Sequence, residues 1–430
     1  MPLFGTSGIR RVADKELIQL ALEVGLAVGR VCPNVVVGCD TRTSSQAMKH
    51  ALLSGLLSAG SRCCDAGVIP LPTLAYAARG FDAGAMITAS HNPPQYNGIK
   101  LLNPDGSAFD SSQRREIEEI VSGGSFAVAP WDEIKGGSIY DGAIGEHIAG
   151  ILHNFPVGLK LKVVVDSCCG AASLVTPALL RKLGCEVVAL NCYPSGFFPH
   201  HIEPTEANLG DLMQATKEFG ADLGIAHDGD ADRMMAVDDS GRFIAGDRLL
   251  ALFAQEVGAK DIVTTIDASM SIDESGFKIT RTRVGDTHVS EELRKGGDFG
   301  GEPSGSWIFP DISLCPDGIH AAAQITAIAS HQKLSQLVDN IPHYPILRGS
   351  TSSQGVVVSD LGKYLLAMKP LSVSNIDGIR LDFGDGWLLI RASGTEPKIR
   401  VTAEAKSEAR VHQLYDSALK AIKDCVEGSG

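Results

Sequence analysis

Residues 88–94 (TASHNPP) are the first stretch of this sequence in which residue types and spacing suggest chemistry. They follow the apolar run of residues 83–87, which predicts a short buried strand, and the two prolines can continue neither a sheet ladder nor a helix. Ser90 therefore stands at a strand end, beside His91, where a hydroxyl group can face a cleft. An ordinary polar turn, in which Ser90 bonds to its own backbone, explains the local pattern equally well.

Three aspartates alternate along residues 228–233 (DGDADR), again directly after an apolar run that predicts a strand. Asp228, Asp230 and Asp232 can converge on one hard cation, and without a cation they would repel one another. Mg²⁺ suits such a site, because it prefers a few carboxylates together with a phosphate oxygen. We therefore predict a magnesium site here, with a solvated acidic turn as the plainer alternative.

Two other acidic loops fit residues 228–233 less well. A calcium-binding EF-hand loop needs glycine at its sixth position and glutamate at its twelfth, where this chain has Arg233 and Asp239. No predicted helix precedes the loop either. The Asp-x-Asp nucleophile loop of aspartyl-phosphate phosphatases usually lies near the start of a chain, and it does not account for Asp232.

A third loop, residues 300–306 (GGEPSGS), surrounds Glu302 and Ser304 with glycines. Such a loop can offer an acceptor and a donor group to the hydroxyls of a sugar. A simple glycine-rich turn explains the same residues on local grounds.

The fourth loop, residues 391–400 (RASGTEPKIR), joins the end of a predicted strand to two hydroxyl residues and a glycine. Successive backbone N–H groups at such a place can form an anion-binding nest. Arg391 and Arg400 add charge, with Lys398 as a further candidate, and arginine can hold a phosphate through two parallel hydrogen bonds. A charged hairpin turn would account for the arginines, but not for the Ser-Gly-Thr between them.

Composition limits the class of protein. The chain has 430 residues, of which 44% are hydrophobic and 21% charged, as is usual for soluble globular proteins of about three domains. The net charge of −13 disfavours nucleic-acid binding, which needs a basic face. We see no membrane span, no signal peptide and no P-loop motif. The ten cysteines form no Cys-x-x-Cys pair, which argues against a zinc site and favours a reducing cytoplasm.

Strand-like and helical runs alternate through most of the chain, which predicts α/β layers. Residues 14–31, 44–57, 174–183 and 247–257 have helical spacing, and residues 35–38, 160–166, 186–190 and 223–226 are typical of strands. The strand-helix-strand pattern starts afresh near residues 35, 160 and 262. The last part differs, because strands at residues 379–383 and 387–391 form a hairpin and a long helix at 407–426 follows. We therefore predict a smaller C-terminal α+β domain.

The four loops, in this order and spacing, resemble those of the α-D-phosphohexomutase superfamily, and the resemblance covers essentially the whole chain. It implies three similar α/β domains with mixed sheets and a smaller fourth domain around a central cleft, each domain giving one loop. We place the domains at residues 1–150 (phosphoserine), 151–241 (metal), 242–345 (sugar) and 346–430 (phosphate).

The resemblance also implies a role for each loop. Ser90 would be the phosphoserine, and Asp228, Asp230 and Asp232 would bind one Mg²⁺ together with the Ser90 phosphate. Glu302 and Ser304 would contact sugar hydroxyls. The non-reacting phosphate would be held by Arg391, Ser393, Gly394, Thr395 and Arg400. The remaining expected site residues are Lys100, matching a lysine proposed for proton transfer, and Arg10, His91 and Arg233 around the phosphoserine. Asp40–Thr41–Arg42 is a weaker candidate to support the serine loop.

Within the superfamily, residues 282–286 (TRVGD) and 4–10 (FGTSGIR) look most like phosphoglucosamine mutases, and the form of the sugar loop looks archaeal. We add Asp286 to the expected substrate-binding residues on this basis. Many relatives have a histidine where this chain has Ser306, so no role is carried over to that position. The alternatives are a phosphomannomutase or phosphoglucomutase of the same superfamily and, more remotely, a metal-dependent sugar phosphatase.

These implications together describe a small-molecule enzyme. The expected reaction interconverts glucosamine 6-phosphate and glucosamine 1-phosphate through a phosphoserine and a hexose 1,6-bisphosphate. The expected partner is a sugar phosphate, with no nucleic acid and no membrane, and the protein would be a monomer or a homodimer in the cytoplasm.

Overall fold

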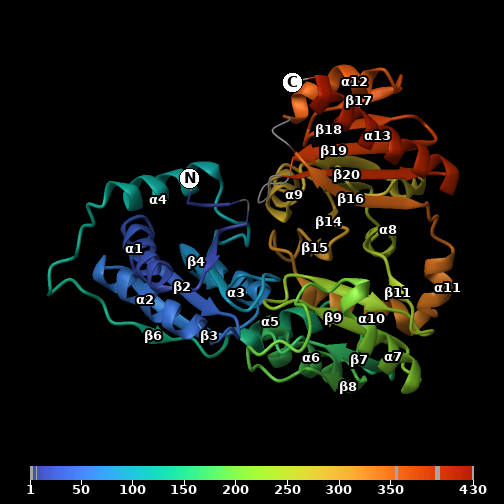
Figure 1. Ribbon diagram of the computed structural model, residues 1–430. Helices are drawn as coiled ribbons and strands as arrows, with labels where there is room; N and C mark the ends of the chain where they lie inside the picture. The colour runs from blue at the N-terminus through green and yellow to red at the C-terminus, as the bar shows by residue number, and fades with distance from the viewer. Residues whose placement is uncertain (1–2, 6, 354–356, 393–397, 429–430) are drawn as a thin grey trace. The chain divides into compact units, whose positions relative to one another are not determined.

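The computed structural model describes residues 3–5, 7–353, 357–392 and 398–428 (Figure 1). The chain folds into two compact units. The first contains Met1–Ala259 and Gly285–Asn340, and the second contains Lys260–Val284 and Ile341–Gly430. The predicted third domain, residues 242–345, is thus divided between the two units, and the four predicted domain boundaries stay predictions. In the described residues, no helix combines the length and the apolar character needed to cross a bilayer.

The first sheet of unit 1 is mixed and has six strands in the order β1-β5-β4-β2-β3-β6. Its strands are β1 (Ile9–Val12), β2 (Asn34–Cys39), β3 (Arg62–Val68), β4 (Ala83–Ile87), β5 (Tyr96–Leu102) and β6 (Ser138–Ile139). Strand β4 runs parallel to β2 and antiparallel to β5. Strand β4 is buried along its whole length and ends at Ile87. The chain therefore leaves the sheet at the carboxyl end of β4. This is the end at which Ser90 lies.

Five helices accompany this sheet: α1 (Lys15–Val31), α2 (Ser45–Ser58), α3 (Leu71–Ala77), α4 (Ser111–Gly123) and α5 (Ala143–Leu152). Helix α1 begins where the Asp14 side chain accepts a hydrogen bond from the Leu17 backbone N–H, which satisfies an otherwise unpaired donor. Helices α1 and α2 pack backbone to backbone, since a Cβ atom at Gly25 would lie 2.3 Å from the Leu52 carbonyl oxygen. Glycine is therefore required at this crossing.

The second sheet of unit 1 has five strands in the order β11-β10-β9-β7-β8. They are β7 (Lys162–Asp166), β8 (Glu186–Leu190), β9 (Leu223–His227), β10 (Met234–Val237) and β11 (Phe243–Ile244). Strands β7 and β9 are parallel, whereas β9 and β10 are antiparallel and are joined by the acidic loop. The mixed α/β sheets predicted from the sequence are thereby confirmed for this unit.

The rest of unit 1 is mainly helical. Its elements are η1 (Ala78–Gly80), η2 (Ala171–Leu174), α6 (Thr176–Lys182), η3 (Glu206–Asn208), α7 (Gly210–Glu218), α8 (Gly246–Glu256), α9 (Asp286–Leu293), α10 (Gly318–His331) and α11 (Leu334–Asp339), with a hairpin of β14 (Phe299–Glu302) and β15 (Ser306–Ile308). The helix predicted at residues 174–183 is α6, which begins at Thr176 because Pro177 favours the first turn of a helix, and the short η2 precedes it.

Unit 2 contains an antiparallel sheet in the order β16-β20-β19-β18-β17. Its elements are β12 (Asp261–Thr265), η4 (Met270–Ser275), β13 (Lys278–Thr282), β16 (Ile346–Ser352), η5 (Val358–Leu361), α12 (Gly362–Leu366), β17 (Ser372–Ser374), β18 (Ile379–Asp382), β19 (Gly386–Ala392), β20 (Lys398–Ala405) and α13 (Glu408–Gly428). Apolar side chains of β18, β19 and β20 share one core with those of α13. The predicted C-terminal α+β character is confirmed.

Candidate active site

Ser90 lies in a buried, strained turn after β4. The residue is 1% exposed and has φ of 50°, a left-handed conformation that is costly for a residue with a Cβ atom. Its backbone N–H donates to the Thr88 hydroxyl at 2.9 Å. Its own hydroxyl donates to Asp228 Oδ2 at 2.8 Å and lies 3.1 Å from His91 Nδ1. The structure thus brings the predicted serine loop directly to the predicted metal loop.

The metal loop connects β9 and β10 and is buried from Asp228 to Asp232. Oxygen atoms of Asp228, Asp230 and Asp232 all lie within 4.8 Å of one another. Oδ1 of Asp230 and Oδ1 of Asp232 are buried without a hydrogen-bond partner. Unpaired buried carboxylate oxygens are costly, and a divalent cation with oxygen ligands would satisfy both. The donors present therefore fit the predicted Mg²⁺.

The two loops meet at a glycine. A Cβ atom at Gly229 would lie 2.7 Å from the Ser90 carbonyl oxygen, so only glycine permits this approach. On the other side, the Gly229 carbonyl oxygen accepts a hydrogen bond from the Ala171 N–H at 2.9 Å, and the Asp230 carbonyl oxygen accepts one from the Leu71 N–H at 2.9 Å. The metal loop is therefore held by backbone donors from η2 and α3.

Lys100, on β5, points at the aspartates. Its ammonium group lies 3.1 Å from Asp230 Oδ2 and 2.6 Å from Asp232 Oδ2. Burial alone would lower the pKa of Lys100, but the two carboxylates outweigh burial and raise it above its usual range. Burial raises the pKa of Asp232, yet Lys100 and Arg233 reverse this effect and bring it to about 2. Lys100 and Asp232 thus form a charged pair.

Asp228 behaves differently from Asp232. Burial, followed by repulsion from Asp232 and Asp230, raises its pKa well above the usual range of a carboxyl group. A bound cation would remove this unfavourable term, because its charge stabilises the ionised carboxylate. The carboxylate that contacts Ser90 is therefore the one whose charge most needs a metal.

His91 is surrounded by cations. Burial, then the charges of Arg233 and Arg10, lower the pKa of His91 to about 2, so the imidazole is neutral at any ordinary pH. Arg10 donates to Asn92 Oδ1 at 2.9 Å, and Arg233 Nη1 lies 2.8 Å from Glu203 Oε1. Arg10, Arg233 and Lys100 act electrostatically on His91, which lies against Ser90. A negative group on Ser90 would therefore be favoured.

The sugar loop is the turn between β14 and β15. Glu302 is buried, and its Oε1 accepts a hydrogen bond from the Gly285 N–H at 2.8 Å, while Ser304 is exposed. Ser306 pairs through its backbone with Glu302 and forms a bridge with Arg233. The loop is therefore fixed to the strand that follows the metal loop.

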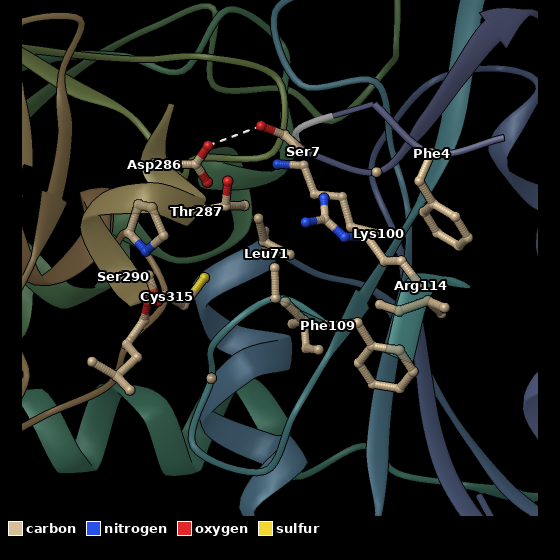
Figure 2. A pocket seen from close by; sticks show the side chains of 17 residues that line it. Phe4, Ser7, Leu71, Lys100, Phe109, Arg114, Asp286, Thr287, Ser290 and Cys315 are labelled. Atoms are coloured by element: carbon tan, nitrogen blue, oxygen red, sulfur yellow. Dashed lines mark hydrogen bonds between the residues drawn. The ribbon is translucent and has the colours of Figure 1, made fainter. Parts of the chain in front are cut away.

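A pocket in unit 1 contains Lys100 and Asp286 in its lining (Figure 2). Asp286, the first residue of α9, accepts a hydrogen bond from the Ser7 hydroxyl at 2.9 Å, drawn as the dashed line in Figure 2. Apolar side chains, among them Leu71 and Phe109, form much of the remaining lining. The predicted substrate residue Asp286 thus shares a pocket with the predicted catalytic Lys100.

The predicted phosphate-binding arginines lie in unit 2. Arg391 in β19 and Arg400 in β20 are direct cross-strand partners, so their side chains share one face of the sheet. Like charges opposite each other are unfavourable, and an anion between them would offset the repulsion. Arg391 Nη1 lies 2.9 Å from Asp377 Oδ2, while Arg400 is exposed. Ser393, Gly394 and Thr395 lie outside the described residues.

Asp40 and Arg42, expected from the sequence only as weaker candidates, form a network with the serine loop. Arg42 and Asp40 are buried, and Asp40 Oδ2 lies 3.1 Å from Arg42 Nε. The Thr88 hydroxyl lies 2.8 Å from Asp40 Oδ2 and 3.0 Å from Asp230 Oδ2. The signal that could have found these residues is their position, since Asp40 directly follows β2, the parallel neighbour of β4.

Comparison with known proteins places the chain in a family. Successive parts match the models for phosphoglucomutase/phosphomannomutase alpha/beta/alpha domains I, II and III and for its C-terminal domain, over residues 1–127, 146–241, 245–344 and 355–421. The chain belongs to the phosphoglucomutase/phosphomannomutase family of α-D-phosphohexomutases, as the four loops predicted, and the predicted fold class and enzyme class are confirmed.

Individual relatives narrow the comparison. The chain is 49% identical to a "Probable phosphoglucosamine mutase" of Methanococcoides burtonii, with 99% of this chain and all of the relative covered. It is 48% identical to a protein of the same name from Methanocella arvoryzae, covering 99% of both. A crystal structure of a phosphoglucomutase/phosphomannomutase family protein from Burkholderia thailandensis is 29% identical, with a TM-score of 0.87, over 99% of this chain and 97% of that one.

Proposed function

We propose that this chain is a phosphoglucosamine mutase that interconverts glucosamine 6-phosphate and glucosamine 1-phosphate. The observation that carries the proposal is the contact between the Ser90 hydroxyl and Asp228, inside a buried carboxylate triad that fits a divalent cation. The name of the relatives at 49% and 48% identity supports glucosamine phosphate over other hexose phosphates.

Ser90 is the proposed phosphate carrier. The phosphoserine would carry close to two negative charges, and Arg10, Arg233 and Lys100 supply nearby positive charge. Asp228, Asp230 and Asp232 would hold Mg²⁺, which neutralises charge on the transferring phosphate. Phosphoryl transfer depends mainly on positioning and electrostatics, so the strained, hydrogen-bonded serine loop suits it.

The proposed reaction has two transfers. In the first, the bond between phosphorus and Ser90 Oγ breaks as a bond to the free sugar hydroxyl forms, which gives glucosamine 1,6-bisphosphate. The intermediate then reverses its orientation, and its other phosphate returns to Ser90. The sugar hydroxyl loses one proton and Ser90 Oγ gains one, so the step balances, and Lys100 is the proposed proton-transfer residue near the reacting hydroxyl. His91 stays neutral and orients the serine.

The remaining site residues bind the substrate. Glu302, Ser304, Arg233 and Asp286 are proposed to contact the sugar. Arg391 and Arg400, with Ser393, Gly394 and Thr395, are proposed to hold the phosphate that is not reacting, in both orientations of the intermediate. We also propose that the protein works in the cytoplasm as a monomer or a homodimer.

The test is turnover of glucosamine, glucose and mannose phosphates side by side, with the matching 1,6-bisphosphate as activator. The proposal predicts that glucosamine phosphate gives the highest kcat/KM. Glucose or mannose phosphate turned over far faster would show a phosphoglucomutase or phosphomannomutase instead. Steady release of inorganic phosphate without isomerisation would show a phosphatase.

A further inference from the structure

Arg42 uses every hydrogen-bond donor of its guanidinium group. Nε lies 3.1 Å from Asp40 Oδ2. The two terminal nitrogens contact four backbone carbonyl oxygens of the serine loop: Ser90 at 2.8 Å, Asn92 at 2.6 Å, Pro93 at 2.8 Å and Tyr96 at 3.0 Å. Arginine has five N–H donors in a fixed planar fork, so none is left over.

This arrangement determines which way the loop faces. Four carbonyl groups within residues 90–96 turn toward one buried cation. The Ser90 side chain meanwhile contacts Asp228 of the metal loop. The Ser90 carbonyl oxygen is buried and needs such a donor, the Pro93 oxygen also accepts from the Tyr96 N–H at 3.0 Å, and the guanidinium compensates the charge of Asp40. Arg42 is thus the common support of the loop that presents Ser90.

The support is itself fixed from two sides. Asp40 also accepts hydrogen bonds from the Arg42 backbone N–H at 3.0 Å and from the Ser45 hydroxyl at 2.6 Å. The ring of Phe198 lies over the guanidinium, 5.3 Å from Cζ to the ring centroid. Lysine could not replace this residue, because an ammonium group has three donors and no planar fork.

We propose that Arg42 is a positioning residue for phosphoryl transfer, which holds the serine loop so that a phosphate on Ser90 meets the acceptor hydroxyl rather than water. The proposal rests on the function proposed above. A loop that loses several of these bonds leaves the phosphoserine present but displaced, and misplacement of reacting groups by about 1 Å costs roughly a hundredfold in rate. A larger share of the phosphate on Ser90 is then transferred to water and a smaller share to the sugar.

The experiment compares Arg42→Lys with Arg380→Lys in the full-length protein. Arg380 is a matched control, because it is also buried and packs on an aromatic ring, Trp387, with 4.1 Å from Cζ to the ring centroid. Each protein is labelled at Ser90 with phosphate from glucosamine 1,6-bisphosphate. The labelled protein is then mixed with glucosamine 6-phosphate, and label recovered in sugar and in inorganic phosphate is measured per labelled chain.

We expect Arg42→Lys to lower the transfer rate at least about tenfold and to raise the share of label lost to water. Arg380→Lys should leave this share unchanged. An unchanged share in Arg42→Lys, with only less folded protein, would overturn the proposal and leave Arg42 a stability residue. Phe198→Leu leaves the arginine in place, so it should raise the share of label lost to water by a smaller amount. If Arg42→Lys does not fold, this second variant tests the proposal. Wild-type protein that takes up no label at Ser90 would instead contradict the proposed function.

Discussion

The region around Ser90 and the strand pair that carries Arg391 both bring cations together, but they treat charge differently. In the serine region, Lys100 is buried against two aspartates, and Arg42 uses all its donors on Asp40 and backbone carbonyls. In the strand pair, Arg391 faces Arg400 across the ladder, and Arg400 is exposed. In the serine region both of these cations are buried against acceptors, whereas in the strand pair one of the two arginines is exposed.

This difference indicates two separate tasks. Phosphoryl transfer is sensitive to sub-ångström placement, and buried, fully bonded groups provide it. A phosphate that only has to be held, in two orientations of the intermediate, needs charge and a forked donor more than rigid placement. We therefore expect changes near Ser90 to act on kcat and changes at the arginine pair to act on KM.

The largest effect is expected for Ser90→Ala. Without the hydroxyl no phosphate can be carried, so mutase activity should fall by at least about a thousandfold. Mg²⁺ binding should persist, because the three aspartates remain. The control is Ser61→Ala, another buried serine, which bonds to the Cys32 carbonyl oxygen. If Ser90→Ala were as active as the wild type in an assay supplemented with bisphosphate, the region around Ser90 would not carry the transferred phosphate.

Asp230→Asn should be nearly as severe. Its Oδ1 is one of the two unpartnered oxygens, so we expect at least about tenfold weaker Mg²⁺ binding by calorimetry and a kcat about a hundredfold lower. Removing metal from the wild type with a chelator should abolish turnover, and Mg²⁺ should restore it. The control, Asp238→Asn, changes a buried aspartate that pairs with Arg242. Equal Mg²⁺ affinity in the Asp230 variant and the wild type would rule out the assigned metal site.

Arg391→Lys tests the other side of the comparison. Loss of the fork should raise KM for the sugar phosphate about tenfold, as expected for one weakened charge-assisted hydrogen bond, with kcat changed by less than about threefold. Arg281→Lys is the control, since Arg281 also lies in unit 2 and also pairs with an aspartate, Asp273, at 2.8 Å. A fall in kcat at constant KM would mean that this region takes part in transfer.

The smallest effect concerns stability and pH. His200 Nε2 lies 3.1 Å from Asp166 Oδ2, and Nδ1 lies 2.8 Å from the His201 carbonyl oxygen, so both ring nitrogens face acceptors. The bond to Asp166, then the contact with Cys168, raises the pKa of His200 from its usual 6.5 to about 11. A raised folded-state pKa gives stability that is complete below about pH 6.5 and is lost as pH rises toward 11.

We expect this contribution to be at least about 1.5 kcal/mol, the worth of one charge-assisted hydrogen bond. The measurement is urea unfolding of the wild type and of His200→Gln at several pH values. The difference between them should shrink as pH rises. A difference that does not change with pH would show that His200 is not charged in the folded protein.

Much of the fold could be predicted from periodicity. The strand predicted at residues 83–87 is β4 with the same bounds, because a continuous apolar run before a Pro-Pro pair leaves little choice. The serine and acidic loops could also be placed, since both follow buried strands. The contact between the two loops was expected only from the family resemblance. The structure shows it as a 2.8 Å hydrogen bond from Ser90 to Asp228.

The rest could not be predicted, because it depends on contacts distant in sequence. Arg42 lies 48 residues from Ser90. It binds backbone carbonyl groups, which every residue has, so the types of the side chains do not reveal the contact. Asp377 likewise has no distinguishing sequence pattern. Its ion pair with Arg391 depends on the pairing of the following strand, β18, with β19. The neutral state of His91 follows from its burial and then from the charges of Arg233 and Arg10, and no local sequence pattern encodes either effect.

The most direct test of the whole account follows one phosphate. The wild-type chain is incubated with Mg²⁺ and glucosamine 1,6-bisphosphate labelled in its phosphates, and the labelled peptide is identified by mass spectrometry. It is then chased with unlabelled glucosamine 6-phosphate. We predict label on Ser90 alone, one phosphate per chain, which the chase moves into sugar phosphate at a rate no slower than kcat. Label on another residue, or label on Ser90 that the chase does not remove, would contradict the account.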